Sequence, residues 1–399
     1  MQSHATEQPV PKGPGKVEFI LLMAATMSLV ALCIDAMLPA FGPMAADLDV
    51  ASLNDMQFVI LTLFVGLALG QLFYGPLSDS IGRLPAMHAG FALMAAGTLV
   101  GMFTDDFMTL LAGRFLQGFG AAGPRTVSMA LVRDRFQGAQ MARIMSFIVT
   151  VFVLVPILAP AVGQAILLVS GWRMIFGFTI VFTLLVQAWL LFRQPETLPR
   201  KNRRSFTFSG IAWGFREVVT NLPTMTYTVI AGCIFGSLMG YLNSCQQVFQ
   251  VQYGLGKLFP LYFAGLVFTA GIASVLNGSL VMRFGMHLLT FRALYFIAIL
   301  AWLLLLTSWF TDGHPPLWQF MLLMSAWFFG MGVVFGNINA MAMEEMGHVA
   351  GSAAAVIGTL STLIAVGLGY LVGNAYDGSV MPLALGFATL TSALSLIHI

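Results

Sequence analysis

Long runs of apolar residues dominate the chain, and short polar segments separate them. Each run has about 17 to 25 residues, the length that an α-helix needs to cross the hydrocarbon core of a bilayer. The pattern predicts twelve such spans, at residues 17–41, 55–77, 84–103, 107–131, 141–168, 172–192, 224–248, 258–282, 286–310, 316–341, 350–373 and 378–398. The predicted fold is an all-α integral membrane protein with twelve transmembrane helices.

Composition supports this class, and the positions of the charged residues predict the orientation of the chain in the membrane. Only 9% of the 399 residues are charged and 58% are hydrophobic, whereas a soluble domain carries about 25% charged residues. With both termini in the cytoplasm, fourteen of the eighteen Lys and Arg residues fall on the cytoplasmic side, and only Arg173 and Lys257 fall outside. Because positive residues concentrate in cytoplasmic loops, an N-in/C-in topology is predicted. The net charge of +2 then reflects topology, and no nucleic-acid partner is expected.

The longest polar interruption divides the chain into two halves. Its sequence, RQPETLPRKNRRSFTFSG, begins at Arg193 and is basic, as a loop beside anionic lipid would be. Three residues after the second span recur 203 positions later, after the eighth: Gly75, Leu77 and Gly82 match Gly278, Leu280 and Gly285. Such repetition is typical of transporters built from two related halves. We predict a cytoplasmic tail at 1–16, six-helix bundles at 17–192 and 224–399, and a linker at 193–223.

Among the few charged residues inside the predicted spans, the clearest are Asp35, Arg114 and Arg125. A charge at the centre of a membrane helix costs roughly 2.5–3.5 kcal/mol, so such residues normally face a cavity or a partner. Asp35 and Arg114 lie at a similar depth, which permits an ion pair or a water-bridged pair. One interpretation is a structural salt bridge. The other is a titratable switch, in which small changes in geometry load or release a proton.

Arg125 follows Arg114 by eleven residues, close to three helical turns, so both point from one face of the fourth span. Arg125 either lines a cavity, where it favours an acidic or acceptor-rich substrate group, or extends toward the cytoplasmic interface.

Amide side chains form a stripe at the end of the seventh span. Asn243, Gln246 and Gln250 follow the i, i+3, i+7 spacing of one helix face, with Gln247 beside them. Such amides either hold helices together or line a wet cavity in which they bind substrate.

Motifs of other functional classes are missing from the sequence. It has no G-x-S-x-G, H-E-x-x-H or Walker A motif, and its six His are scattered. Cys33, Cys233 and Cys245 lie in spans without metal-ligand spacing. We therefore expect no enzymatic activity, no metal and no cofactor. Any transport is expected to be driven by an ion gradient or by the gradient of the solute itself.

Five segments carry a family resemblance: IDAMLPAF, YGPLSDSIGRLP, RFLQGFGAAG with the later ALVRDRF, LVPILAPAVGQAIL, and GHVAGSAAAVIG. Together they resemble the major facilitator superfamily and, within it, the Bcr/CflA-type drug/proton antiporters. The resemblance implies that Asp35 carries the proton and that Arg114 and Gln117 belong to the family's motif in the fourth span.

The same resemblance implies roles for residues that change conformation. Gly75 and Gly82 would form a tight turn between the second and third spans. Asp79, at a helix N-terminus, and Arg83 would hold the halves together in the outward-open state. The antiporter motif of the fifth span would bend this helix and pack it closely, through Pro156, Pro160 and Gly163.

The predicted function is proton-coupled efflux of a drug-like or amphipathic organic solute, by a monomer in the bacterial inner membrane. Asp35 and Arg114 are the candidates for proton coupling. The candidates for substrate binding are Arg125, Gln117, Asn243, Gln246 and Gln250. Two alternatives remain: a carrier for an endogenous, anionic metabolite held by Arg125, and a membrane sensor or scaffold that transports nothing.

Overall fold

The computed structural model describes residues 13–203 and 205–396, and in this part of the chain every regular element is helical. The long helices are α1 (Lys16–Asp35), α3 (Phe58–Ile81), α4 (Arg83–Phe103), α5 (Phe107–Arg135), α6 (Gly138–Ser170), α7 (Arg173–Arg193), α9 (Leu222–Gln246), α10 (Phe259–Phe284), α11 (Met286–Phe310), α12 (Leu317–Met343), α13 (Ala350–Asn374) and α14 (Met381–Leu396). The shorter ones are α2 (Phe41–Asp47), α8 (Phe208–Thr220) and the single turns η1 (Leu38–Ala40), η2 (Leu53–Gln57), η3 (Arg200–Asn202), η4 (Gln247–Gln252), η5 (Gly256–Leu258) and η6 (Gly347–Val349).

Each predicted span overlaps one long helix. Within the described residues, ten helices are long and apolar enough to cross a membrane. The polar helix α5, which carries Arg114 and Arg125, and the sixteen-residue α14 are not among these ten. The all-helical membrane fold is therefore confirmed, while the twelve crossings and the N-in/C-in topology remain predictions.

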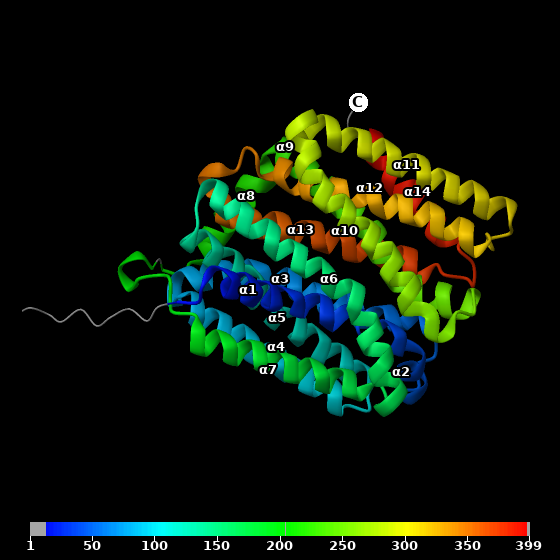
Figure 1. Ribbon diagram of the computed structural model, residues 1–399, viewed down its shortest axis with the longest axis horizontal. Helices are drawn as coiled ribbons and strands as arrows, with labels where there is room; N and C mark the ends of the chain where they lie inside the picture. The colour runs from blue at the N-terminus through cyan, green and yellow to red at the C-terminus, as the bar shows by residue number, and fades with distance from the viewer. Residues whose placement is uncertain (1–12, 204, 397–399) are drawn as a thin grey trace, which may run out of the picture.

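The long helices run side by side along one direction (Figure 1). Helices α3, α4 and α5 pack closely on one another, α9 packs on α13, and α12 packs on α10 and α11. We call α1–α7 the early helices and α8–α14 the late helices. The two sets meet mainly where α3 packs on α13 and where α6 packs on α10. We call the end that carries residues 194–207 and α8 the linker end; it lies on the left in Figure 1.

Glycines bring α3 and α5 into backbone contact. A Cβ atom added to Gly118 would lie 1.9 Å from the carbonyl oxygen of Leu63, and one added to Gly66 would lie 2.1 Å from that of Phe115. Small residues allow membrane helices to approach in this way. The helices α3, α4 and α5 therefore form a block that tolerates little internal movement.

The turn between α3 and α4 is a single residue, Gly82, with φ = 112°. Gly285, with φ = 81°, joins α10 to α11 in the same way. Both conformations strain any residue that has a Cβ atom. The structure corrects the prediction for Gly75, which lies inside α3 with nothing within 4 Å of its added Cβ atom, so it takes no part in this turn.

The first predicted span, 17–41, is not one continuous helix. Helix α1 ends at Asp35, a turn follows, and Pro39 lies in the 3₁₀ turn η1 before α2 begins at Phe41. Proline has no backbone N–H and cannot continue the hydrogen-bond pattern of α1. Asp35 therefore lies at a break in the helix and not within an unbroken run.

Candidate functional site

Asp35 is a buried carboxyl group at the end of α1. Its side chain is 5% exposed, and no hydrogen bond or ion pair to it is found among the described residues. It lies within electrostatic range of Tyr241 and Cys245 on α9. Asp35 therefore lies near the contact between early and late helices, where a change in their packing changes its surroundings.

Arg114 on α5 is fully buried and bonds to neutral acceptors. Its Nε donates to the carbonyl oxygen of Val59 at 2.9 Å, and its Nη1 donates to that of Cys33 at 3.0 Å. The carbonyl of Cys33 is available because the N–H of Met37 bonds to Ile34 instead. The guanidinium thus satisfies a carbonyl group left free by the end of a helix, two residues before Asp35.

Of the two expected arrangements, the direct ion pair between Asp35 and Arg114 is not found among the described residues. Arg114 directs its donors to the two carbonyls and to Gln117 Oε1, at 2.7 Å. One of its nitrogens, Nη2, has no partner. Arg114 holds the backbone that carries Asp35 and does not neutralise the carboxylate directly.

Gln117 completes this cluster inside the early helices. Its amide nitrogen donates to Thr98 Oγ1 at 2.8 Å and to Cys33 Sγ at 3.4 Å, and its side chain is fully buried. This placement does not favour the predicted substrate contact. It supports a role for Gln117 in positioning Arg114.

Arg125 differs from Arg114 although both lie on α5. Arg125 is half-buried, and no hydrogen bond or ion pair to its guanidinium is found among the described residues. It does not line the cavity at the linker end, although the next residue, Thr126, does. A partly accessible cation without a partner is suited to an anionic ligand.

The amide side chains at the end of α9 are divided among different partners. Asn243 donates to the carbonyl oxygen of Gly369 on α13 at 3.0 Å, and Gln246 donates to Gln250 Oε1 at 2.7 Å. Gln247 instead points to Asn54. Residues Gln247–Gln252 form a π-helical turn, whose wider hydrogen-bond spacing changes the register expected for an α-helix.

The end of the molecule opposite the linker is closed by an amide cluster of Asn54, Gln247, Asn374 and Tyr376. The Nδ2 of Asn54 donates to the carbonyl oxygens of Asn374 and Tyr376, at 3.2 and 3.0 Å, and its Oδ1 accepts from Gln247 Nε2 at 2.8 Å. Neutral hydrogen bonds therefore join the early and late helices at this end.

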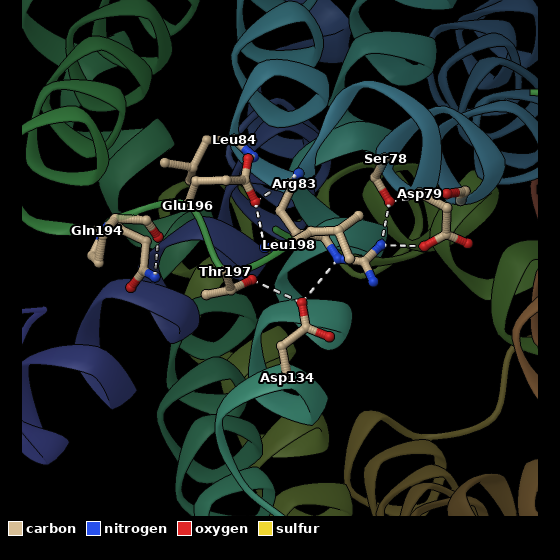
Figure 2. A network of polar contacts seen from close by, with 11 residues as sticks. Ser78, Asp79, Arg83, Leu84, Asp134, Gln194, Glu196, Thr197 and Leu198 are labelled. Carbon is tan, nitrogen blue, oxygen red and sulfur yellow. Dashed lines mark hydrogen bonds and ion pairs between the residues drawn. The ribbon is translucent and has the colours of Figure 1, made fainter. Parts of the chain in front are cut away.

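A charged network lies at the linker end (Figure 2). Arg83, at the start of α4, donates to Asp79 at 2.5 Å, to Asp134 at 3.0 Å and to Ser78 at 2.9 Å. Asp79 was predicted to lie at a helix N-terminus, and the structure corrects this prediction. The residue lies near the end of α3, where Arg83 is four residues away.

Glu196 fixes the linker to the same network. One carboxylate oxygen accepts from the backbone N–H groups of Arg83 and Leu198, at 3.1 and 2.9 Å, and the other accepts from that of Leu84 at 3.0 Å (Figure 2). A Cβ atom on Gly82 would lie 2.7 Å from this side chain. Glu196 therefore caps α4, where a negative charge is favoured.

We expect Glu196→Ala to release the linker. The change removes the acceptor of three backbone donors, and each lost capping interaction costs about 1 kcal/mol. Trypsin should then cleave the native protein after Arg200 or Lys201 about fivefold faster, since cleavage follows local opening. Asp106→Ala, which removes the cap of α5 outside the linker, is the matched control. Equal cleavage rates for Glu196→Ala and wild type would contradict this role.

A cavity of about 440 Å³ lies beside the charged network, between early and late helices. Its lining includes Asp79 and Arg83 from the network, Trp213 from α8, and Ser352 from α13. In the described residues, the amide cluster therefore joins the early and late helices at one end, and a cavity lies between them at the linker end.

Within the early helices, Gly163 brings α6 onto the break in α1. A Cβ atom at Gly163 would lie 1.9 Å from the carbonyl oxygen of Ala36. This confirms the close packing expected of the motif, although α6 continues as one helix through Pro156 and Pro160.

Sequence reasoning missed Asn54, Asp134 and Glu196. Asn54 and Glu196 are single polar residues in connecting segments, and nothing in their local sequence distinguishes them from solvated loop residues. Asp134 directly follows the fourth span in the segment ALVRDRF, which was recognised as a motif but given no partner.

These features define a class: a helical membrane protein with an unpaired acidic residue near the contact between two sets of helices. A model of the Major Facilitator Superfamily matches residues 19–370, and the chain belongs to this family of membrane transporters. It is 32% identical to a bicyclomycin resistance protein homolog of Haemophilus influenzae, over 89% of each chain. It is 24% identical to multidrug resistance protein D of Escherichia coli, over 87% of this chain and 86% of that one. The resemblance predicted from the motifs is confirmed.

A solved structure supports the fold. The human organic anion transporter MFSD10 (TETRAN) superposes with a TM-score of 0.70 at 18% identity, covering 96% of this chain and 99% of that chain.

Proposed function

We propose that the protein exports a drug-like or amphipathic organic solute in exchange for protons, by alternating access in the bacterial inner membrane. The Asp35 carboxyl group carries this proposal. It is buried at a helix break, and no basic group among the described residues pairs with it. Ionisable groups in such positions mark proton and substrate pathways. Two relatives are named for resistance to bicyclomycin and to multiple drugs, and these names support a drug-like solute.

The proposed architecture has twelve crossings, both termini in the cytoplasm, and two six-helix halves, 17–192 and 224–399, joined by the linker 193–223. The linker end is then cytoplasmic. The repeated single-glycine turns at Gly82 and Gly285 support the two related halves. We expect a monomer without cofactor.

The structure then corresponds to an inward-facing state. The amide cluster closes the outer end, and the cavity beside Asp79 and Arg83 lies at the cytoplasmic end. In the proposed cycle the amide cluster opens, Asp35 takes a proton from outside, and the halves rock to seal the cavity. Asp79, which faces α13 across that cavity, would hold the sealed state together with Arg83.

We expect Asn54→Leu to shift the protein toward the outward-open state. The change keeps the size of the side chain and removes three hydrogen bonds, each with a net value of about 0.5–1.5 kcal/mol. A cysteine at the buried Gln57, in a background without the native cysteines, should react faster with an impermeant maleimide added outside. Asn339→Leu is the control, because the bond that Asn339 makes among the described residues stays within its own helix. If labelling in Asn54→Leu is the same as without this substitution, the amide cluster does not control opening of the outer end.

Proton flux tests the proposed function. Inverted vesicles that contain the wild type receive a panel of cationic, neutral and anionic organic compounds while the internal pH is recorded. At least one drug-like compound should dissipate the pH gradient through the protein. If none does, but solutes exchange at constant pH, the protein is a uniporter or is coupled to another ion. If nothing moves, the sensor hypothesis gains support.

A second candidate is a carrier for an organic anion, favoured by the unpaired guanidinium of Arg125. In this case Arg125→Gln should weaken transport of anions at least tenfold. This factor corresponds to the loss of one hydrogen bond to a charged group, which contributes about 1.5–3 kcal/mol. Arg125→Lys should retain part of it. Equal effects of Arg125→Gln on cations and anions would show that Arg125 does not select the charge of the substrate.

A further inference from the structure

An exposed apolar stripe runs along α8, in the linker. Its members recur at intervals of four, three and four residues, which places them on one face of the helix. They are Phe208, Ala212, Phe215 and Val219, and the three larger side chains are 74%, 43% and 42% exposed. Water-facing helices normally place polar residues on such a face.

This stripe is not the face by which α8 packs on the protein. Gly214 and Val218 are buried on an adjacent face, and a Cβ atom on Gly214 would lie 2.7 Å from Cβ of Ser352 on α13. Gly210 and Trp213, on the side opposite the stripe, line the cavity at the linker end. Helix α8 therefore contacts the protein and the cavity with the other residues and leaves the stripe uncovered.

The stripe is continuous with the surface that faces lipid. Helix α8 ends at Thr220, and α9, a candidate membrane span, begins at Leu222 with 77% of that side chain exposed. A single residue, Asn221, separates the two helices. This connection holds α8 at the level where α9 enters the bilayer.

A basic side chain lies at the border of the stripe, and two others lie in the linker segment before α8. Arg216 is exposed one position after Phe215, and Arg200 and Lys201 are exposed in the preceding segment. Helices with an apolar face and a basic border bind the interface of anionic membranes. The positive charge favours a lipid surface over a second copy of this chain, which would bring the same cations together.

We propose that α8 lies in the membrane–water interface, with its stripe among the acyl chains and Arg216 on anionic lipid head groups. Under the proposed topology this is the inner leaflet. The lipid would then fix the position of a helix that lines the cavity and packs on α13. The lipid composition would thereby influence closure of the linker end.

Spin labels on the full-length protein test this proposal. Single cysteines replace Phe208, Phe215, Ser209 or Thr220; the native cysteines are buried and are replaced where they react. The protein is placed in phosphatidylcholine vesicles with or without phosphatidylglycerol. Collision rates with oxygen, which concentrates in the acyl region, and with a water-soluble nickel chelate are then compared.

We expect labels at Phe208 and Phe215 to show a higher ratio of oxygen to nickel collisions than labels at Ser209 and Thr220. Phosphatidylglycerol should raise the ratio further at the stripe, and Arg216→Gln should reduce this dependence on composition. Nickel access to Phe208 and Phe215 equal to that at Ser209 would place the stripe in water and overturn the proposal. Protection of the stripe from both reagents would indicate a protein cover and would overturn it too. Neither outcome depends on transport activity.

Discussion

Asp35→Asn abolishes substrate-driven proton movement if Asp35 is the proton carrier. Asparagine keeps the shape of the side chain, so solute binding and downhill exchange should survive while drug-induced proton flux falls to the level of empty vesicles. If proton and solute compete for one site in the wild type, solute affinity should rise with pH by up to about tenfold per unit, the linkage of one released proton. This dependence should vanish in Asp35→Asn.

The matched control is Asp35→Glu, which keeps a carboxyl group and should retain coupling at a reduced rate. Solute binding by both variants and the wild type, measured across a pH series, separates loss of coupling from loss of binding. If the Asp35→Asn variant still exchanges protons for solute, Asp35 is not the proton carrier and has a structural role.

Arg114→Lys should destabilise the protein by about 2–5 kcal/mol, because buried acceptors left without a donor cost about 1–3 kcal/mol each. An ammonium group cannot reproduce the fork by which the guanidinium holds the carbonyls of Val59 and Cys33 and the amide of Gln117. A thiol-reactive dye can follow thermal unfolding, since Cys33, Cys233 and Cys245 are buried until the helices separate.

Arg125→Lys is the control for this experiment. Arg125 has no hydrogen bond among the described residues, so its replacement should change the free energy of unfolding by no more than about 0.5 kcal/mol. Equal stability of the two lysine variants would mean that the bonds of Arg114 contribute nothing to the fold. It would also weaken the view that Arg114 positions the end of α1.

The apolar runs predicted the helices well because helix length and bilayer thickness are linked directly. They could not predict the interruption after Asp35, since Leu38 and Ala40 of η1 are as apolar as a helix interior. Only Pro39 signalled the break. Asp35 was therefore found as a candidate from its charge, but its place at a free helix end required the structure.

Depth along a span predicts which residues are level with each other, but not which partner each selects. Asp35 and Arg114 were expected to pair on this basis. In the structure Arg114 instead donates to the carbonyl oxygen of Cys33, which the break in α1 leaves unbonded, and to that of Val59 on α3. The amide stripe was misplaced for a related reason: helical spacing assumes 3.6 residues per turn, and the π-helical turn at Gln247–Gln252 departs from it.

The two ends of the molecule are held by different kinds of bond. At the linker end, the ion pair of Arg83 with Asp79 includes a carboxylate that is 48% exposed, and such a solvent-exposed ion pair becomes weaker as the salt concentration rises. At the opposite end, Asn54 bonds to amide and carbonyl groups, which neither salt nor moderate acidity alters. A cell regulates the ionic strength of its cytoplasm but not of its surroundings. Under the proposed topology, the neutral hydrogen bonds would face the outside and keep their strength in a brackish, dilute or acidic medium, and the salt-sensitive ion pair would lie in the buffered cytoplasm.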